Sequence, residues 1–555
     1  ELGVPSERVV YKEDFWSGGG NAGPDLEACV DGLEVSTLVF MRYKIVGDKL
    51  VEMPIRTVDT GYGMERWAWL SQGSPSGFHA IYGSVLEKLV ALLELGVDKK
   101  LISEVTRLSS VMSLESASHR VKARKILAEQ LGMRWQELDE SLTSLESAYA
   151  VLDHTKALAF MLAEGVVPSN IREGYLTRLL IRRVCRMLQS LGIGDRLNEI
   201  MEMQVEFWSR DFPTLKKMRA EISNALSIEK SKYDKTLERG SGLVKRLAHD
   251  LKVKRIERIP VETLVELYDS HGLVPDVVEH FARRENLGVD APDNFFALVS
   301  NRHSGAQVAE EVRFPNDLER KVRELPATKL LYYEDAYIRV FEANVLNTFD
   351  GKYVVLDRTS FYSEGGGQMA DNGALLFENK TARVIDVQKI GNIIVHIIEG
   401  PVPKAEQSVT GQIDWDRRAS LMRHHTATHL LIGAARRVLG EHAWQAGAHK
   451  DVDQSRLDIT HYEKLTDQEI SDIELAAVKA IMDNLPVETM WMPRQIAEQR
   501  YGFRLYQGGV VPGKEIRVVR IGDWDVEACG GTHCRTTGEV GLLKILRVDR
   551  IQDGV

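Results

Sequence analysis

The sequence predicts a multidomain protein of mixed α/β and α+β class, and three observations lead to this prediction. With 555 residues, the chain is long enough for roughly three or four domains. Its pattern changes from strands with glycine turns, through a long helical region, to short strands that alternate with turns. In its last part helices and strands mix around histidine and cysteine pairs that have the spacing of metal ligands.

Residues 1–75 form the first predicted domain, in which strands alternate with glycine turns. Residues 33–43 are rich in Val, Leu and Phe, which favour a strand. Residues 57–66, TVDTGYGMER, follow a strand and lead into a helix-like stretch, and their glycines leave room for a ligand against the backbone. Arg66 has the fork geometry that suits a phosphate. A strand-to-helix turn with an ordinary surface arginine explains the same residues, so this motif alone is weak evidence.

Residues 76–290 form a predicted helical domain, because apolar residues recur at intervals of three and four, as in residues 85–93. A cluster of arginines gives this region a basic patch of the kind that phosphate contact requires, although a solvated helix face explains it equally well. The cluster comprises Arg172, Arg178, Arg182, Arg183 and Arg186. Residues 291–326 are less periodic and are predicted to be a linker.

Residues 327–415 predict a small β-barrel. Short β-like segments at residues 353–356, 384–387 and 393–398 alternate there with turns. Residues 416–555 follow as a predicted α+β domain that contains the metal-ligand motifs.

Two pairs of residues predict a metal site. His425 and His429 lie four residues apart in a predicted helix that runs to Gly440, so both rings lie on one face. Cys529 and His533 are also four apart, in the sequence CGGTHC, whose glycines suit a tight loop. Imidazole and thiolate are the ligands that zinc prefers, and four of them complete a tetrahedron. We therefore predict one Zn²⁺ per chain, bound by these four side chains.

The residues next to these pairs exclude a metalloprotease motif and limit the set of metal ligands. No glutamate follows the first histidine of the pair, so the His-Glu-x-x-His pattern of metalloproteases is absent. We expect His424 and Cys534 not to be ligands, because His424 points about 100° away from its neighbour on a helix of about 3.6 residues per turn.

Composition limits the class of protein. The chain is 44% hydrophobic and 27% charged, and it contains no apolar run long enough for a membrane span. Its four scattered cysteines do not make a disulfide framework, which predicts a reducing, cytoplasmic location. A net charge of −10 argues against a surface that binds nucleic acid everywhere but permits local basic patches.

The metal-ligand motifs resemble those of the editing domain of alanyl-tRNA synthetases and of related free-standing deacylases. Residues 361–371, FYSEGGGQMAD, resemble the glycine-rich turn near the editing pocket of that family. Gln445, in the sequence WQAG, matches a family position that lines the pocket. The resemblance implies an editing pocket that includes Gly366, Gly367 and Gln445 beside a zinc ion.

The N-terminal motif resembles motif 3 of class II aminoacyl-tRNA synthetases in the alanyl form, and residues 16–27, WSGGGNAGPDLE, resemble the preceding glycine-rich stretch. The resemblance implies that residues 1–75 are the C-terminal part of the antiparallel-sheet aminoacylation domain. Arg66 would contact the phosphates of ATP, which is bound with Mg²⁺. Asp59 would hold the amino group of alanine, and Gly61 and Gly63 would shape a pocket too small for larger side chains.

The helical region also resembles the alanyl family. Residues 168–175, PSNIREGY, and 267–272, LYDSHG, resemble the segments that read the tRNA acceptor stem. On that resemblance Asn170 and Asp269, with Arg172 beside them, would bind the G·U pair of tRNA(Ala), since amide and carboxylate groups match its exposed donors and acceptors. From the residues alone, Asn170 is a helix N-cap.

The resemblance spans nearly the whole chain and is to the archaeal type. It implies a ligase that attaches alanine to tRNA(Ala) with ATP, and hydrolyses mischarged Ser-tRNA(Ala) and Gly-tRNA(Ala). Class II motifs 1 and 2 are not found in the sequence, so we expect this chain alone to retain only tRNA binding and editing. The resemblance implies that homodimers could form through a C-terminal tail, which we expect this chain to lack. Two alternatives stay open: a stand-alone trans-editing deacylase, and a zinc-stabilised RNA-binding module without chemistry.

Overall fold

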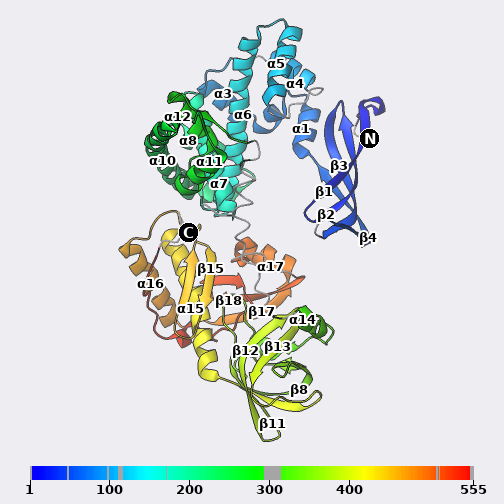
Figure 1. Ribbon diagram of the computed structural model, residues 1–555, viewed down its shortest axis with the longest axis vertical. Helices are drawn as coiled ribbons and strands as arrows, with labels where there is room; N and C mark the ends of the chain where they lie inside the picture. The colour runs from blue at the N-terminus through cyan, green and yellow to red at the C-terminus, as the bar shows by residue number, and fades with distance from the viewer. Residues whose placement is uncertain are drawn as a thin grey trace. The chain divides into compact units, whose positions relative to one another are not determined.

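The computed structural model describes residues 3–46, 49–96, 99–109, 117–169, 172–254, 256–292, 295, 314, 316–507, 511 and 513–549. The chain divides into two compact units (Figure 1). The first unit comprises Glu1–Ala163 and Leu179–Leu226, and the second comprises Glu164–Arg178 and Ser227–Val555. Residues 76–290, expected as one helical domain, thus contribute to both units, and the predicted domain boundaries stay predictions.

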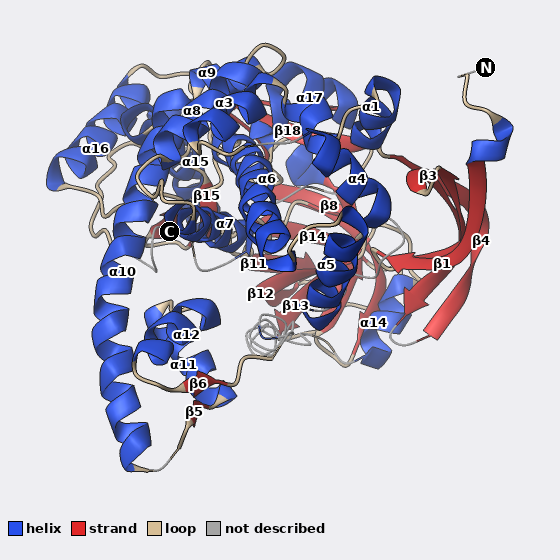
Figure 2. Ribbon diagram, turned by 90° about the horizontal axis from the view of Figure 1, so that it is seen from above, coloured by secondary structure: helices blue, strands red, loops and turns tan. Residues whose placement is uncertain are grey.

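The first unit begins with a four-stranded antiparallel sheet (Figure 2). Its strands follow one another in chain order. The strands are β1 (Val9–Gly18), β2 (Asn21–Val30), β3 (Leu33–Val46) and β4 (Lys49–Tyr62). β3 contains the predicted strand at residues 33–43, which is therefore confirmed. β4 is solvent-exposed along nearly its whole length, and it leads through Gly63 into α1 (Met64–Gln72). Residues 57–62 were expected to follow a strand, but they are themselves part of β4, so the strand-to-helix turn is at Gly63.

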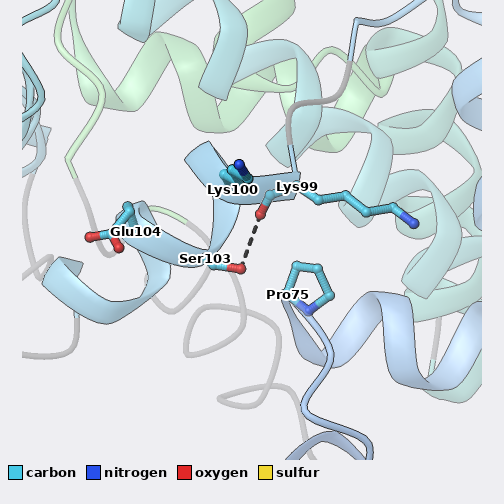
Figure 3. Close-up of a pocket in the computed structure, with 5 residues that line it drawn as sticks. All are labelled: Pro75, Lys99, Lys100, Ser103 and Glu104. Atoms are coloured by element: carbon cyan, nitrogen blue, oxygen red, sulfur yellow. Dashed lines mark hydrogen bonds between the residues drawn. The ribbon is translucent and has the colours of Figure 1, made fainter.

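Helices make up the rest of the first unit. They are α2 (Gly77–Tyr82), α3 (Ser84–Leu92), α4 (Lys99–Ser109), α5 (Ala117–Leu131), α6 (Trp135–Ala163), α8 (Leu197–Trp208) and α9 (Pro213–Lys217), with parts of α7 (Arg172–Ser190) and α10 (Arg219–Val253). α6 packs against α8, where the buried Gln204 amide donates to the carbonyl of Leu152 over 2.9 Å. A pocket beside α4 is lined by Pro75, Lys99, Lys100, Ser103 and Glu104 (Figure 3), none of which is a predicted site residue.

The second unit contains two further helices, α11 (Val261–His271) and α12 (Pro275–Arg284), and two paired short strands, β5 (Arg258–Ile259) and β6 (Gly288–Val289). Residues 316–323 lie within the stretch expected to be a linker, but they form helix α14 (Asn316–Arg323). Leu318 and Val322, one turn apart on α14, pack on strand residues that include Tyr353 and Val355. The burial of this short apolar face explains why the segment is helical.

A closed six-stranded barrel follows, as the alternating segments predicted. Its strands are β8 (Val340–Phe349), β9 (Tyr353–Leu356), β11 (Gly373–Phe377), β12 (Lys380–Ile390), β13 (Ile393–Glu399) and β14 (Ser408–Ile413), in the order β11-β12-β13-β9-β8-β14. The short strands β7 (Lys329–Leu330) and β10 (Arg358–Thr359) pair beside it. Val345, Leu356, Val384 and Ile394 belong to its buried core. Because the barrel is closed, each of its six strands pairs on both sides.

The remaining residues form an α+β region in which two helices pack together. The helices and strands are α15 (Trp415–Leu439), β15 (Gln445–Lys450), β16 (Ser455–Ile459), α16 (Asp467–Met482), β17 (Val487–Pro493), α17 (Arg494–Tyr501), β18 (Glu515–Ile521) and β19 (Asp525–Ala528). The Asp414 carboxylate accepts from the Arg417 N–H and caps α15, which ends just before Gly440 as predicted. No helix of the described residues is long and apolar enough to cross a membrane.

Candidate metal centre and adjoining sites

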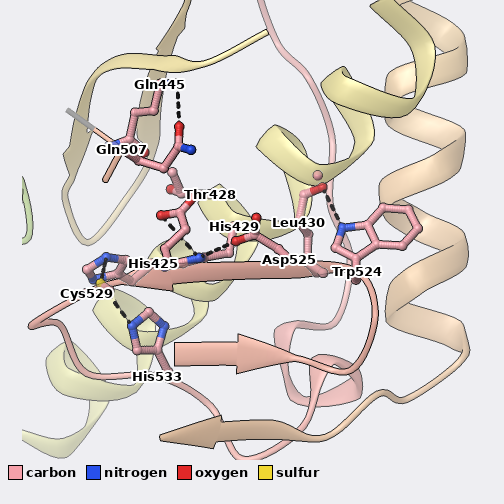
Figure 4. Close-up of polar contacts among 12 residues, drawn as sticks. His425, Thr428, His429, Leu430, Gln445, Gln507, Trp524, Asp525, Cys529 and His533 are labelled. Atoms are coloured by element: carbon pink, nitrogen blue, oxygen red, sulfur yellow. Dashed lines mark hydrogen bonds and ion pairs between the residues drawn. The ribbon is translucent and has the colours of Figure 1, made fainter. Parts of the chain in front are cut away.

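Four side chains that are distant in sequence converge in the second unit (Figure 4). His425 and His429 come from α15, while Cys529 and His533 lie in the loop after β19. Their ligand atoms all lie within 4.8 Å of one another. Sγ of Cys529 is 3.3 Å from Nε2 of His425 and 3.4 Å from Nε2 of His533. A tetrahedral zinc site with bonds of about 2.0–2.3 Å has edges of about 3.3–3.8 Å, so these spacings fit one ion.

A glutamine orients the ring of His425. Oε1 of Gln368 lies 2.8 Å from Nδ1 of His425, and the same oxygen accepts from the backbone N–H of Thr532 over 3.1 Å. The Gln368 amide nitrogen donates to the Thr532 hydroxyl over 2.9 Å, which fixes the orientation of the amide. Because Oε1 can only accept, Nδ1 of His425 carries the proton, and Nε2 keeps its lone pair toward Cys529.

A carboxylate orients the second histidine. Nδ1 of His429 lies 2.8 Å from Oδ2 of Asp525, whose other oxygen accepts from Arg436 over 2.9 Å. An oxygen of Glu527 is 3.5 Å from the same nitrogen. Alternate residues of a strand face the same side, so Asp525 and Glu527 on β19 face the centre together with Cys529. Hydrogen bonding of Nδ1 leaves Nε2 of His429 for a metal.

The protonation states of His425 and Cys529 are those that metal binding requires. Burial lowers the pKa of His425 to about 4, so its ring is neutral at pH 7. Burial would raise the pKa of the Cys529 thiol, but His425 and His533 outweigh it and hold that pKa well below its usual range. Burial of His429 is outweighed by Glu527 and Asp525, which raise its pKa, so binding of a metal there releases a proton.

The glycine-rich turn is attached to β15 close to this centre. Gly367 has a φ of +74°, and a Cβ atom there would lie 2.0 Å from the carbonyl oxygen of Ala448, so only glycine fits. The Lys450 backbone N–H donates to the Gly367 carbonyl over 2.7 Å, and its ammonium group donates to that of Gly366 over 2.9 Å. The turn thereby places Gln368 against His425.

Gln445 is the first residue of β15, and its backbone N–H donates to the side-chain oxygen of Gln507 over 3.0 Å. In Figure 4 both glutamines lie on the side of His425 away from His533. His424 and Cys534, which we expected not to be ligands, do not belong to the four-residue group. The His424 ring contacts the carbonyl of Asp451, and Cys534 is buried.

The residues of the N-terminal motif lie together on the first unit. Asp59 and Gly61 are exposed on β4, and Gly63 is the N-cap of α1. Asp59 pairs with Val39 on β3, which pairs in turn with the buried Asp25 on β2, so the two acids share one row across the sheet.

Arg66, on α1, is half-exposed and reaches back to β3. Its guanidinium lies 2.9 Å from the carboxylate of Glu34 and donates to the carbonyl of the same residue over 3.0 Å. A phosphate at this position would compete with Glu34 for the guanidinium.

The expected tRNA-reading residues are only partly described. Asn170 lies outside the described residues, as do the side chains of Arg172 on α7 and Asp269 on α11. The segments that carry them meet in the second unit, where the hydroxyl of Tyr268 donates to that of Tyr175.

The arginine patch is smaller than the sequence indicated. Arg178 is only 4% exposed, and its Nε lies 3.2 Å from the buried carboxylate of Glu229. It is therefore a buried ion-pair residue, whereas Arg183 is exposed. A charge buried in this way is unavailable to a phosphate backbone.

Sequence reasoning missed Gln368, Asp525, Glu527 and Arg436. Two signals were present. Residues 525, 527 and 529 alternate along a strand, and Arg436 follows His429 by seven residues, two turns along the same helix face. The role of Gln368 had no such signal, because it depends on contact with Thr532, 164 positions away in sequence.

A family model described as tRNA synthetases class II (A) matches residues 1–417. The chain belongs to this family. A second model, described as Threonyl and Alanyl tRNA synthetase second additional domain, matches residues 516–555, the region that contains Cys529 and His533. Because the class II match begins at residue 1, it gives no support to the expectation that this chain lacks motifs 1 and 2.

Curated relatives from archaea align with the whole of this class II chain. It is 46% identical to Alanine--tRNA ligase of Pyrococcus abyssi, 46% to that of Thermococcus kodakarensis and 47% to that of Korarchaeum cryptofilum. The chain spans 62%, 62% and 61% of the length of these three proteins.

Proposed function

We propose that this protein is an alanine–tRNA ligase with an editing centre. It attaches alanine to tRNA(Ala) with ATP and Mg²⁺, and hydrolyses Ser-tRNA(Ala) and Gly-tRNA(Ala). The observation that supports editing best is the convergence of His425, His429, Cys529 and His533, two of which lie in the region matched by the alanyl and threonyl model. The relatives named Alanine--tRNA ligase support the choice of amino acid.

The chemistry of alanine explains why such an enzyme needs a second site. Glycine lacks only a methyl group, and one methylene is worth only about 1–3 kcal/mol of discrimination. Serine adds a hydroxyl group that an apolar pocket rejects poorly. Binding in the first site therefore cannot exclude either competitor, and a hydrolytic site that removes mischarged products solves the problem.

Zn²⁺ fits the four side chains, since the thiolate and three buried imidazoles are its preferred donors and their spacing matches one ion. When bound, zinc polarises an ester carbonyl or lowers the pKa of a water molecule. Gln368 and Asp525 keep Nδ1 of the two helix histidines occupied, which directs both Nε2 atoms to the centre. Gly366 and Gly367, whose carbonyls are held by Lys450, line the pocket, and the Gln445 amide can bond the hydroxyl of a seryl group.

The remaining roles follow the family motifs. When ATP binds, the guanidinium of Arg66 leaves the carboxylate of Glu34 and contacts the phosphates. Asp59 accepts a hydrogen bond from the ammonium group of alanine. Gly61 and Gly63 keep that pocket small. Asn170 and Asp269, with Arg172, bind the acceptor stem of tRNA(Ala).

Hydrolysis of Ser-tRNA(Ala) by the zinc-loaded chain tests the editing proposal. Cys529→Ala should lower the hydrolysis rate at least 100-fold, whereas Cys29→Ala, in the sheet of the first unit, should leave it unchanged. Equal hydrolysis by Cys529→Ala and the parent would remove Cys529 from the editing mechanism.

Chelation separates the proposal from a structural zinc module. The proposal requires hydrolysis by the zinc-loaded chain that stops when zinc is removed. A chain that never hydrolyses Ser-tRNA(Ala), yet unfolds on chelation, would have a structural metal only.

A further inference from the structure

A buried arginine on β18 holds the loop that carries the cysteine ligand. Arg517 is 7% exposed, and its Nη1 donates to the carbonyl oxygens of Cys529 over 2.7 Å and of Gly531 over 3.0 Å. The carbonyl of Arg517 also accepts from the backbone N–H of Cys529 over 3.1 Å. Arg517 therefore binds both backbone polar groups of Cys529, its N–H and its carbonyl.

An aromatic ring fixes the guanidinium in turn. Cζ of Arg517 lies 5.1 Å from the ring centroid of Tyr333, which makes an edge contact with Trp491, the residue that pairs with Arg517 across β17 and β18. A Cβ atom on Gly530 would lie 3.2 Å from the Tyr333 hydroxyl, so this ring also borders the loop. A planar guanidinium can stack on the ring and bond two carbonyls at once, which an ammonium group cannot do.

The loop has little freedom to compensate if this support is removed. A Cβ atom on Gly531 would lie 2.0 Å from the ring of His425, and the Gly531 N–H lies 3.5 Å from Sγ of Cys529. A small shift of the loop therefore moves the sulfur relative to both His425 and His533.

We propose that Arg517 is a positioning residue for the metal centre: by bonding the carbonyls of Cys529 and Gly531, it sets the metal affinity and the coordination geometry at Sγ. This inference depends on the metal centre of the proposed function. It adds a residue outside the four-residue ligand group.

The test compares Arg517→Met and Arg517→Lys with Arg520→Met in the full chain. Arg520 lies on the same strand and holds the Gly522 carbonyl and Asp523 in the following turn, so its variant controls for loss of an arginine from β18. Zn²⁺ affinity is measured by competition with a chromophoric chelator, and the Co²⁺-loaded protein gives a visible ligand-field spectrum. Tyr333→Leu, which leaves Arg517 in place without its ring, is a second variant.

We expect Arg517→Met to weaken Zn²⁺ binding about 10–100-fold, the usual effect of losing a group that orients a ligand, and to shift the Co²⁺ bands. Arg517→Lys should be intermediate, and Arg520→Met should match the parent. Parent-like affinity and spectrum in a folded Arg517→Met would overturn the inference while leaving the editing proposal intact. If Arg517→Met does not fold, parent-like behaviour of both Arg517→Lys and Tyr333→Leu would overturn it. A parent that binds no Zn²⁺ would overturn both proposals.

Discussion

The two candidate sites of this chain are held in opposite ways. In the second unit, the three histidine ligands are at most 4% exposed, and Gln368, Asp525 and Arg517 fix the two helix histidines and the cysteine loop. On the first unit, Asp59 and Gly61 lie on an exposed strand, and Glu34 holds Arg66 through a partly exposed ion pair and a bond to its carbonyl.

This difference indicates where stability and function are coupled. A buried, interlocked centre loses both folding free energy and activity when one member changes. An exposed strand can lose a side chain with little effect on folding, so a defect there reports on ligand binding alone. The following predictions test that contrast.

Metal removal should give the largest difference between the two regions. At a metal concentration 1,000 times its dissociation constant, binding stabilises the folded state by about 4 kcal/mol. Chelation should therefore increase amide hydrogen exchange in β18, β19 and the following loop, while exchange in β1–β4 stays unchanged. Equal increases in both regions would contradict the contrast.

A buried histidine in the barrel should make stability depend on pH. Burial lowers the pKa of His396 to about 4, and its ring bonds Thr359 and the carbonyl of Val354. Since the unfolded chain binds this proton near pH 6.5, the contribution of His396 is complete above that pH and is lost as pH falls toward 4. The loss is about 3 kcal/mol over that range.

Urea unfolding of the parent and of two variants at pH 7 and pH 5 measures this effect. The difference in unfolding free energy between the parent and His396→Gln should shrink at pH 5. His449→Gln, at an exposed position on β15, is the control and should not change the pH dependence. A constant difference for His396→Gln would show that the ring is not buried as a neutral base.

Gly531→Ala should cost about 1–3 kcal/mol of folding free energy, because its Cβ atom would overlap the ring of His425. It should also weaken metal binding. Gly530→Ala is the matched control, since it meets only the Tyr333 hydroxyl, at 3.2 Å. Thermal unfolding of both zinc-loaded variants checks the prediction, and equal melting temperatures would contradict it.

Arg66→Ala should have the smallest effect on stability. The pair with Glu34 is partly exposed, so its loss should change the unfolding free energy by no more than about 1 kcal/mol. ATP binding, measured by calorimetry, should nevertheless weaken. A large loss of stability would show that Arg66 is a structural residue.

Local sequence patterns predicted local structure well. The helix that carries His425 ends before Gly440 as expected, and the strand at residues 33–43 and the barrel were confirmed, because periodicity and turn residues encode them directly. The short helix α14 was missed, since two apolar residues give too brief a pattern.

Features that depend on contacts between distant residues could not be predicted. Arg178 looked like part of a basic surface, but tertiary packing buries it against Glu229. The ligand pairs could be found from their spacing of four, whereas Gln368 and Arg517 act through backbone groups of a distant loop. A cap to a neighbouring backbone N–H can be predicted from residue type, but no local pattern encodes a bond to a backbone group that is distant in sequence.

X-ray absorption at the zinc edge of the purified, zinc-loaded chain tests the central claim most directly. We predict one sulfur at about 2.3 Å and three nitrogens at about 2.0–2.1 Å around each zinc ion, with the sulfur lost in Cys529→Ala. A shell of light atoms without sulfur, or a sulfur signal that survives in Cys529→Ala, would contradict the proposed centre.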